Sequence, residues 1–171
     1  MQSRPLGDTG LGVTSLGLGL AALGRPGYLN LGHGGDLNGR RAVETLEQHT
    51  HDMLDAAWQS GIRYFDAARS YGRAETFLAS WLSARAVAPD SITVGSKWGY
   101  RYTADWQVDV ETHEVKDLSV DHLESQYRET VDLLSGYLGL YQIHSATPAV
   151  LEDLAVMERL AEIRSQAWSL G

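Results

Sequence analysis

The chain has 171 residues, of which 43% are hydrophobic, and a formal net charge of −8. Its length and hydrophobic content suit a single domain with one core, whereas the acidic balance excludes a broad basic surface for nucleic acid or anionic membranes. The sequence has no cysteine, so disulfides and thiolate metal sites are excluded. It has neither a signal-peptide pattern nor a run of about 18 apolar residues, so we expect a cytoplasmic protein without a membrane span.

The first residues predict a small β-hairpin followed by a strand. Residues 4–15 place several glycines between apolar residues, which is typical of a hairpin with a glycine-rich turn. Leu16–Leu20 follows as the first strand. Residues 17–22 also have the G-x-G-x-x-A spacing of a dinucleotide-binding turn, but Leu23–Gly27 would break the helix that such a site requires. We therefore assign no Rossmann-type site here.

A glycine-rich loop and a helix come next. The loop spans Gly24–Gly39, at a position where binding loops are common. The helix is predicted over about Val43–Ser60. It carries His49 and His51, which project roughly 200° apart on a helix, so we assign no metal site to them.

A strand, a turn and a helix between Gly61 and Val87 organise the chain. Ile62–Asp66 contains β-forming residues, and residues 73–87 place apolar side chains at helical spacing. In such a unit the carboxyl end of the strand and the following turn face a common rim. Asp66 and Tyr71 should therefore point into one site.

Two later strands end in the same way. Ile92–Lys97 and Leu138–His144 are apolar runs, and each ends in one titratable residue. Because the carboxyl ends of parallel strands share a rim, Lys97 and His144 should join Asp66 and Tyr71. Taken singly, each of the four has a simpler interpretation: Asp66 as a turn former, Tyr71 as rim packing, Lys97 as a solvent-facing cation and His144 as a hydrogen-bonded strand end.

The residues after Lys97 predict an aromatic-rich loop that reaches about Lys116. Trp98 and Tyr100 either wall a substrate pocket or cover apolar surface on the sheet, and both interpretations stay open. Further helices are predicted from about Ser119 to Gly136 and over Val150–Arg164. Residues 167–170 then predict the start of a fifth strand.

Five segments resemble the aldo-keto reductase family, in that family's order. They are Arg4–Leu11, Leu16–Gly19, Gly61–Glu75, Gly95–Lys97 and Leu140–His144. The resemblance implies an oxidoreductase that uses NADPH or NADH to interconvert carbonyl compounds and alcohols, with aldehydes, ketones and sugars as candidate substrates. It also implies a (β/α)8 barrel, or TIM barrel, with the hairpin at its floor.

The resemblance assigns roles to particular residues. Tyr71 would be the general acid, Lys97 would lower its pKa, Asp66 would hold Lys97, and His144 would orient the carbonyl group. The cofactor would contact the strand ends, and the substrate would contact the aromatic loop. The expected cofactor contacts are Gly19, Leu20, Ala21 and Asp66, and the expected substrate contacts are Trp98 and Tyr100.

The length fits only part of such a barrel, which takes about 250 residues. We therefore predict an α/β fold with an N-terminal hairpin and the first four to five βα units, in a single domain over residues 1–171 that is truncated at about the fifth strand. In the resembled family most of the cofactor site comes from strand ends five to eight. We expect weak or undetectable NADPH binding and negligible turnover, and we expect the open half-barrel to self-associate or to be poorly packed. A catalytically incomplete binding module and a flavodoxin-like domain are the alternatives.

Overall fold

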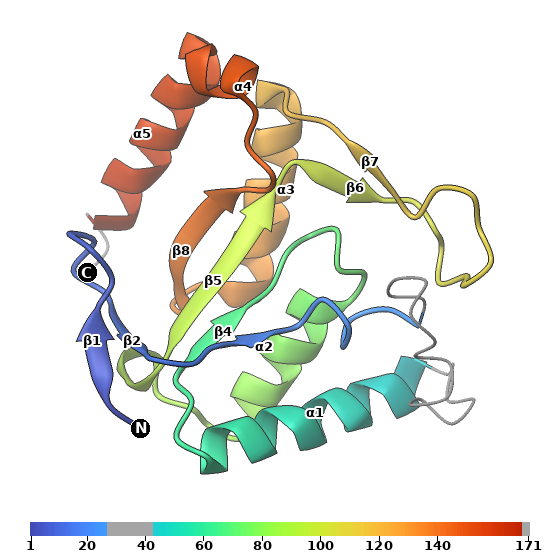
Figure 1. Cartoon of the computed structure of the whole chain (residues 1–171), viewed down its shortest axis with the longest axis vertical. Helices are drawn as coiled ribbons and strands as arrows, with labels where there is room; N and C mark the ends of the chain where they lie inside the picture. Colours follow the sequence, from blue (N-terminus) through green and yellow to red (C-terminus); the bar gives the residue numbers. More distant parts are fainter. Residues whose placement is uncertain (27–42, 169–171) are drawn as a thin grey trace.

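The computed structural model describes residues 1–26 and 43–168. Its main sheet has parallel strands in the order β3-β4-β5-β8, of which β4, β5 and β8 are labelled in Figure 1. These strands are β3 (Leu18–Gly19), β4 (Tyr64–Asp66), β5 (Thr93–Trp98) and β8 (Leu138–Ile143). These four strands lie side by side in chain order, which confirms the predicted partial (β/α)8 barrel. A flavodoxin-like sheet would place the first strand between later ones, so that alternative is wrong.

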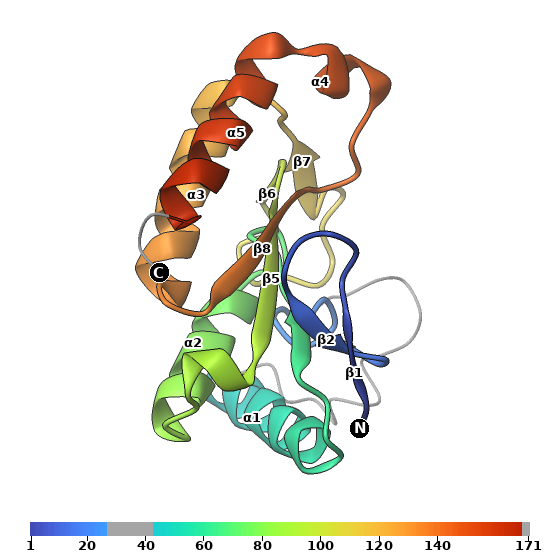
Figure 2. The ribbon, with the colours of Figure 1, turned by 90° about the vertical axis from the view of Figure 1, so that its left-hand side faces the viewer.

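Helices alternate with these strands, as expected for βα units. They are α1 (Val43–Gln59), α2 (Ala74–Ala84), α3 (Val120–Leu134), α4 (Pro148–Glu152) and α5 (Leu154–Trp168), with a 3-10 turn, η1, at Pro89–Ser91. Figure 2 shows α2, α3 and α5 on one side of the sheet. Helix α3 begins where the sequence predicts, because the Ser119 side chain caps it by accepting from the His122 N–H.

Two clusters of buried side chains attach the helices to the sheet. The first packs α1 and α2 against β4 and β5 and includes the fully buried Phe65 and Trp81. The second lies among α3, α4 and α5 and includes Trp98, Leu123 and Val156. Burying a large apolar side chain stabilises a fold by roughly 1.5–3 kcal/mol, so these clusters fix the strands and, with them, the strand ends.

The N-terminal hairpin closes one end of the sheet. Its strands are β1 (Ser3–Pro5) and β2 (Gly12–Thr14), which pair antiparallel as predicted. The Thr93 hydroxyl donates to the Gly12 carbonyl, and the Arg63 N–H donates to the Thr14 hydroxyl. Thr93 opens β5 and Arg63 directly precedes β4, so the hairpin lies at the amino ends of these strands, opposite their carboxyl ends.

A second hairpin stands where the sequence predicts an irregular aromatic loop. Its strands are β6 (Tyr100–Tyr102) and β7 (Glu114–Lys116), and Tyr100 pairs with Lys116. Three alternating residues are too short a pattern to separate a strand from a loop, and the partner strand lies more than ten residues further on. The pairing satisfies the backbone groups of a segment that extends beyond the sheet (Figure 1).

The C-terminal helices differ from the sequence prediction in two respects. The predicted helix over Val150–Arg164 is two helices, because Asp153 interrupts it and its side chain caps α5 by accepting from the Ala155 and Val156 N–H groups. The predicted fifth strand is wrong at residues 167 and 168, which belong to α5. Residues 169–171 lie outside the described part.

The predicted loop over Gly24–Gly39 also lies outside the described residues, except for 24–26. Of the helices in the part described, none is long and apolar enough to cross a membrane.

Candidate active site

Parallel strand ends bring the predicted site residues to one rim. Asp66 is the last residue of β4, where it lies between Gly19 of β3 and Gly95 of β5 in the sheet register. Lys97 lies near the end of β5, and His144 directly follows β8. The His144 N–H donates to the Trp98 carbonyl at 2.8 Å, which extends the pairing of β5 and β8 to the rim.

Lys97 links three parts of the site through its ammonium group. Its Nζ donates to Asp66 Oδ2 at 2.5 Å, to the Ala67 carbonyl at 2.9 Å and to the Tyr71 hydroxyl at 3.4 Å. The Lys97 and Asp66 side chains are only 15% and 23% exposed. An ammonium and a carboxylate with so little water are stabilised chiefly by each other. The expected contact of Lys97 with both Asp66 and Tyr71 is therefore present.

The turn before α2 fixes Tyr71. The Tyr71 N–H donates to the Ala68 carbonyl, and the Arg73 N–H donates to the Gly24 carbonyl at 2.7 Å. Gly72 has a φ of +64°, and a Cβ there would lie 2.5 Å from the Gly24 carbonyl oxygen. Only glycine fits this close approach, so the turn holds the Tyr71 side chain over Lys97, whose Nζ lies 4.8 Å from the ring centroid.

His144 completes the group. Its ring packs edge-on against Tyr71 and Tyr100, with ring centroids 5.4 and 5.0 Å away. Burial, together with the Lys97 ammonium, holds the pKa of His144 below its usual range. Both effects favour the neutral imidazole.

Three further residues at the site were not predicted from the sequence. The Ser70 hydroxyl lies 3.3 Å from His144 Nδ1. Arg25, which is 5% exposed, donates through Nη1 to the Ser70 carbonyl at 3.1 Å and to Glu114 of β7 at 3.2 Å. Ser70 could have been suspected, because it directly precedes Tyr71 in the turn. Arg25 and Glu114 are 89 residues apart, and no local pattern links them.

The residues expected to contact cofactor and substrate fall into two groups. Gly19 is exposed and Ala21 half-buried at the rim, whereas Leu20 is fully buried and its N–H donates to the Asp66 carbonyl. Tyr100 lies beside His144. Trp98 was expected to contact the substrate, but its side chain is fully buried among α3, α4 and α5. It therefore does not line a pocket at the rim.

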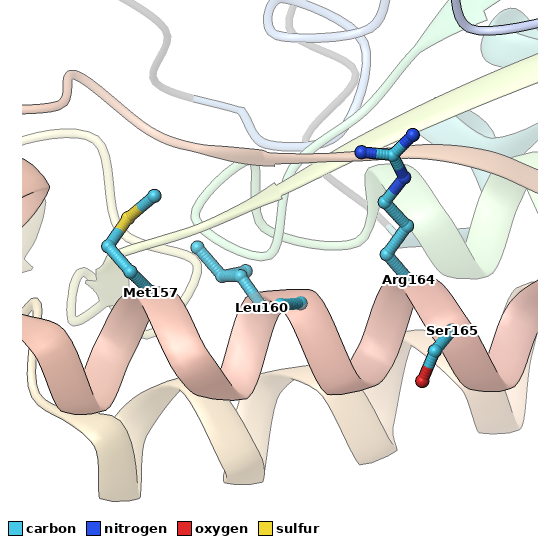
Figure 3. A pocket seen from close by; sticks show the side chains of 5 residues that line it. Met157, Leu160, Arg164 and Ser165 are labelled. Carbon is cyan, nitrogen blue, oxygen red and sulfur yellow. The ribbon is translucent and has the colours of Figure 1, made fainter.

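An open hollow of about 560 Å³ lies along α5, away from the strand-end residues. Its lining side chains project from successive turns of the helix (Figure 3). They are Met157, Leu160, Ala161, Arg164 and Ser165. Arg164 is the one ionisable group in this lining, so the hollow offers no acid–base pair. We therefore place the candidate site at the strand ends.

Comparison with known proteins identifies relatives. A model of the aldo/keto reductase family matches residues 16–166. Pyridoxal 4-dehydrogenase of Microbacterium luteolum is 37% identical over 100 residues, which is 57% of this chain and 24% of that protein. A solved structure from Pseudomonas aeruginosa, described as an aldo-keto reductase, is 26% identical in sequence to this chain. Its TM-score is 0.69, and the match covers 96% of this chain and 56% of that one.

A second solved structure has the same fold. It is the holo form of an aldo-keto reductase from Bacillus halodurans, with a TM-score of 0.69 at 24% identity, and the match covers 97% of this chain and 47% of that one. The chain therefore spans about half, or less, of the length of these relatives.

Proposed function

Because the chain belongs to the aldo-keto reductase family, we propose that it carries the proton-transfer site of an oxidoreductase that interconverts small carbonyl compounds and alcohols with NADPH or NADH. The observation that carries the proposal is the contact of one ammonium, that of Lys97, with both the Asp66 carboxylate and the Tyr71 hydroxyl. A general acid next to a fixed cation is what carbonyl reduction requires.

Tyr71 is the proton donor in this proposal. Reduction of a carbonyl group places negative charge on its oxygen, and that oxygen then takes the phenol proton. The Lys97 ammonium, 3.4 Å from the Tyr71 oxygen, stabilises the phenolate left behind. Asp66 orients the Lys97 ammonium through their hydrogen bond. In the oxidation direction the phenolate takes the proton of the alcohol.

His144 orients the carbonyl group. A neutral imidazole can donate one hydrogen bond to the carbonyl oxygen without adding a second full cation beside Lys97. The edge-on contacts with Tyr71 and Tyr100 hold the ring at the rim. Proton donor and orienting group therefore approach the same oxygen.

The rim beside Asp66 fits the reactive end of a nicotinamide cofactor, which supplies the hydride when bound. Gly19 is paired in register with Asp66, and a side chain built at Gly19 would meet no atom within 4 Å. A flat ring can therefore approach the backbone of Gly19. Because the chain spans about half of its relatives, we propose that tight cofactor binding needs further polypeptide.

Pyridoxal is the first substrate to test. The relative with 37% identity is named a pyridoxal 4-dehydrogenase. Tyr100 offers an aromatic face beside His144 against which a flat aldehyde can stack.

One observation favours a second candidate function, a reductase-like module that binds a partner without turnover. The chain covers only 56% and 47% of the two solved relatives. Such a module would keep the fold and the strand-end contacts without needing the cofactor.

Rates and cofactor titrations on Tyr71→Phe separate the two functions. With millimolar NADPH and pyridoxal, the wild-type chain should turn over slowly, and Tyr71→Phe should lower the rate by about 10²–10⁴-fold while the NADPH titration stays unchanged. Tyr127→Phe, in α3 and packed against Tyr141, is the matched control and should keep the wild-type rate. Absence of any turnover that depends on Tyr71 would favour the binding module.

A further inference from the structure

A neutral histidine carries its proton on one of two nitrogens, and the choice decides what it can donate. The Nδ1 atom of His144 faces the Ser70 hydroxyl at 3.3 Å. Within the described residues, the other nitrogen, Nε2, has no hydrogen-bond partner, so it is the nitrogen available to a ligand. The partner of Nδ1 therefore determines whether Nε2 presents a proton or a lone pair.

Ser70 is held tightly in the turn between β4 and α2. It is 1% exposed, and its carbonyl accepts from Arg25 Nη1 at 3.1 Å. The same Nη1 donates to Glu114 on the hairpin of β6 and β7, so the guanidinium is itself anchored. These contacts fix the backbone of Ser70 and leave its hydroxyl directed at the His144 ring.

The direction of the bond follows from the needs of a buried hydroxyl. Among the described residues, Nδ1 of His144 is the one hydrogen-bond partner of the Ser70 hydroxyl. If Nδ1 carried the proton, the hydroxyl would accept from it, and its own hydrogen would be buried without an acceptor, which costs stability. Donation from Ser70 to Nδ1 satisfies both groups.

We propose that Ser70 is a positioning residue that donates to Nδ1 of His144 and so holds the imidazole in the tautomer with its proton on Nε2. The functional meaning rests on the proposed reductase function. An Nε2–H donates to a carbonyl oxygen, whereas the other tautomer would direct a lone pair at that oxygen and repel it.

The chain contains a contrasting serine–histidine pair that serves as a control. On α1, His51 Nε2 lies 2.8 Å from the Ser80 hydroxyl of α2. There the hydroxyl donates to Glu47 at 2.5 Å, so His51 must be the donor. In the proposal, the serine hydroxyl donates to His144. At His51 the serine hydroxyl accepts instead, because its own proton goes to the Glu47 carboxylate.

Long-range proton–nitrogen correlation spectra of the ¹⁵N-histidine-labelled full chain test the proposal, with His144 assigned by its loss in His144→Gln. We expect the Nδ1 signal of wild-type His144 at the far-downfield position of an unprotonated nitrogen and the Nε2 signal at the protonated position. Ser70→Ala should move the Nδ1 signal toward the average of the two tautomers, and Ser70→Thr, which keeps the hydroxyl, should restore it. Ser80→Ala should change the signals of His51 and leave those of His144 in place.

A proton on Nδ1 of His144 in the wild-type chain would overturn the proposal. So would a Ser70→Ala spectrum identical to that of the wild type. The spectra are recorded without cofactor or substrate, so they decide the tautomer even if the chain shows no turnover. Turnover with the wrong tautomer would refute the role of Ser70 and leave the proposed function standing.

Discussion

Lys97 is the residue on which the candidate site depends most, because its ammonium contacts both the Tyr71 hydroxyl and the Asp66 carboxylate. Asp66→Asn would leave the ammonium, 15% exposed, without a charged partner. We expect this change to lower the free energy of unfolding by about 2–4 kcal/mol. Arg101→Gln is the control, since the Arg101 side chain is 61% exposed in its pair with Asp117 and should cost less than about 1 kcal/mol. Urea titrations measure the free energy of unfolding of both variants. Equal losses in the two would contradict the importance of the ion pair between Lys97 and Asp66.

The histidines give stability a defined pH dependence. Burial lowers the pKa of both His122 and His144 in the folded chain. Below the unfolded value of about 6.5 the unfolded chain therefore binds more protons, so the free energy of unfolding should fall as the pH drops from about 7 toward the lowered folded values. Hydrogen bonds donated by Arg85 and Ser119 lower the pKa values of Asp55 and Asp117 respectively. The stability that these two carboxylates contribute is therefore lost only at more acidic pH.

Urea midpoints at pH 7.5 and 5.5 measure this slope. Replacing His122 and His144 together by glutamine should flatten it, because the two depressed groups are gone. An unchanged slope in the double variant would show that other groups carry the pH dependence.

Strand alternation explains which site residues could be predicted. Asp66, Lys97 and His144 were recognisable because each is a titratable residue at the end of an apolar strand. Trp98 directly follows Lys97, so its side chain points to the opposite face and packs on α3 and α5. The same alternation that supports Lys97 thus argues against Trp98 as a pocket wall. The Ser70 hydroxyl contacts His144, which is 74 positions away in the sequence, and no local pattern indicates this partner.

At the scale of elements, the turn between β4 and α2 depends on one glycine. Gly72 and Gly136 both have positive φ, +64° and +82°, but only at Gly72 would a Cβ meet a backbone oxygen, at 2.5 Å. Gly136→Ala should cost about 1 kcal/mol from strain alone, and Gly72→Ala distinctly more. Comparing the two by urea unfolding isolates the close approach. Equal costs would mean that the turn can shift to admit a side chain.

Element boundaries were the least predictable part of the fold. Helix α5 continues through residue 168 because residues 164–167 are compatible with a helix, and the aromatic residue that suggested a strand does not override them. The break before α5 comes from Asp153, a capping residue inside an otherwise continuous apolar pattern. Order and type of the long elements were predictable because their apolar periodicity extends over many residues.

At the scale of the whole molecule, the sheet has an uncovered edge. Strand β8 pairs with β5, and no described strand pairs with its other side. Near it, α5 exposes Leu154 by 75% and Met157 by 39%. Open strand edges and exposed apolar side chains favour association. We therefore predict that the isolated chain self-associates.

Sedimentation velocity over a range of concentrations measures that association. Leu154→Glu combined with Met157→Glu should weaken it, whereas Leu16→Glu, at a position 60% exposed in the N-terminal segment, is the control and should not. A compact wild-type monomer with a cooperative melt would contradict the prediction.

We propose that the strand-end residues of this chain transfer a proton and that a bound nicotinamide cofactor would supply the hydride to a carbonyl carbon. The most direct measurement uses pyridoxal and NADPH in which both hydrogens at the nicotinamide C4 are deuterium. These are incubated with concentrated chain, and the alcohol formed is analysed by mass spectrometry. We predict one deuterium at the former carbonyl carbon with the wild-type chain and at least 10²-fold less labelled alcohol with Tyr71→Phe. Unlabelled alcohol, or equal labelling by the two proteins, would contradict the account.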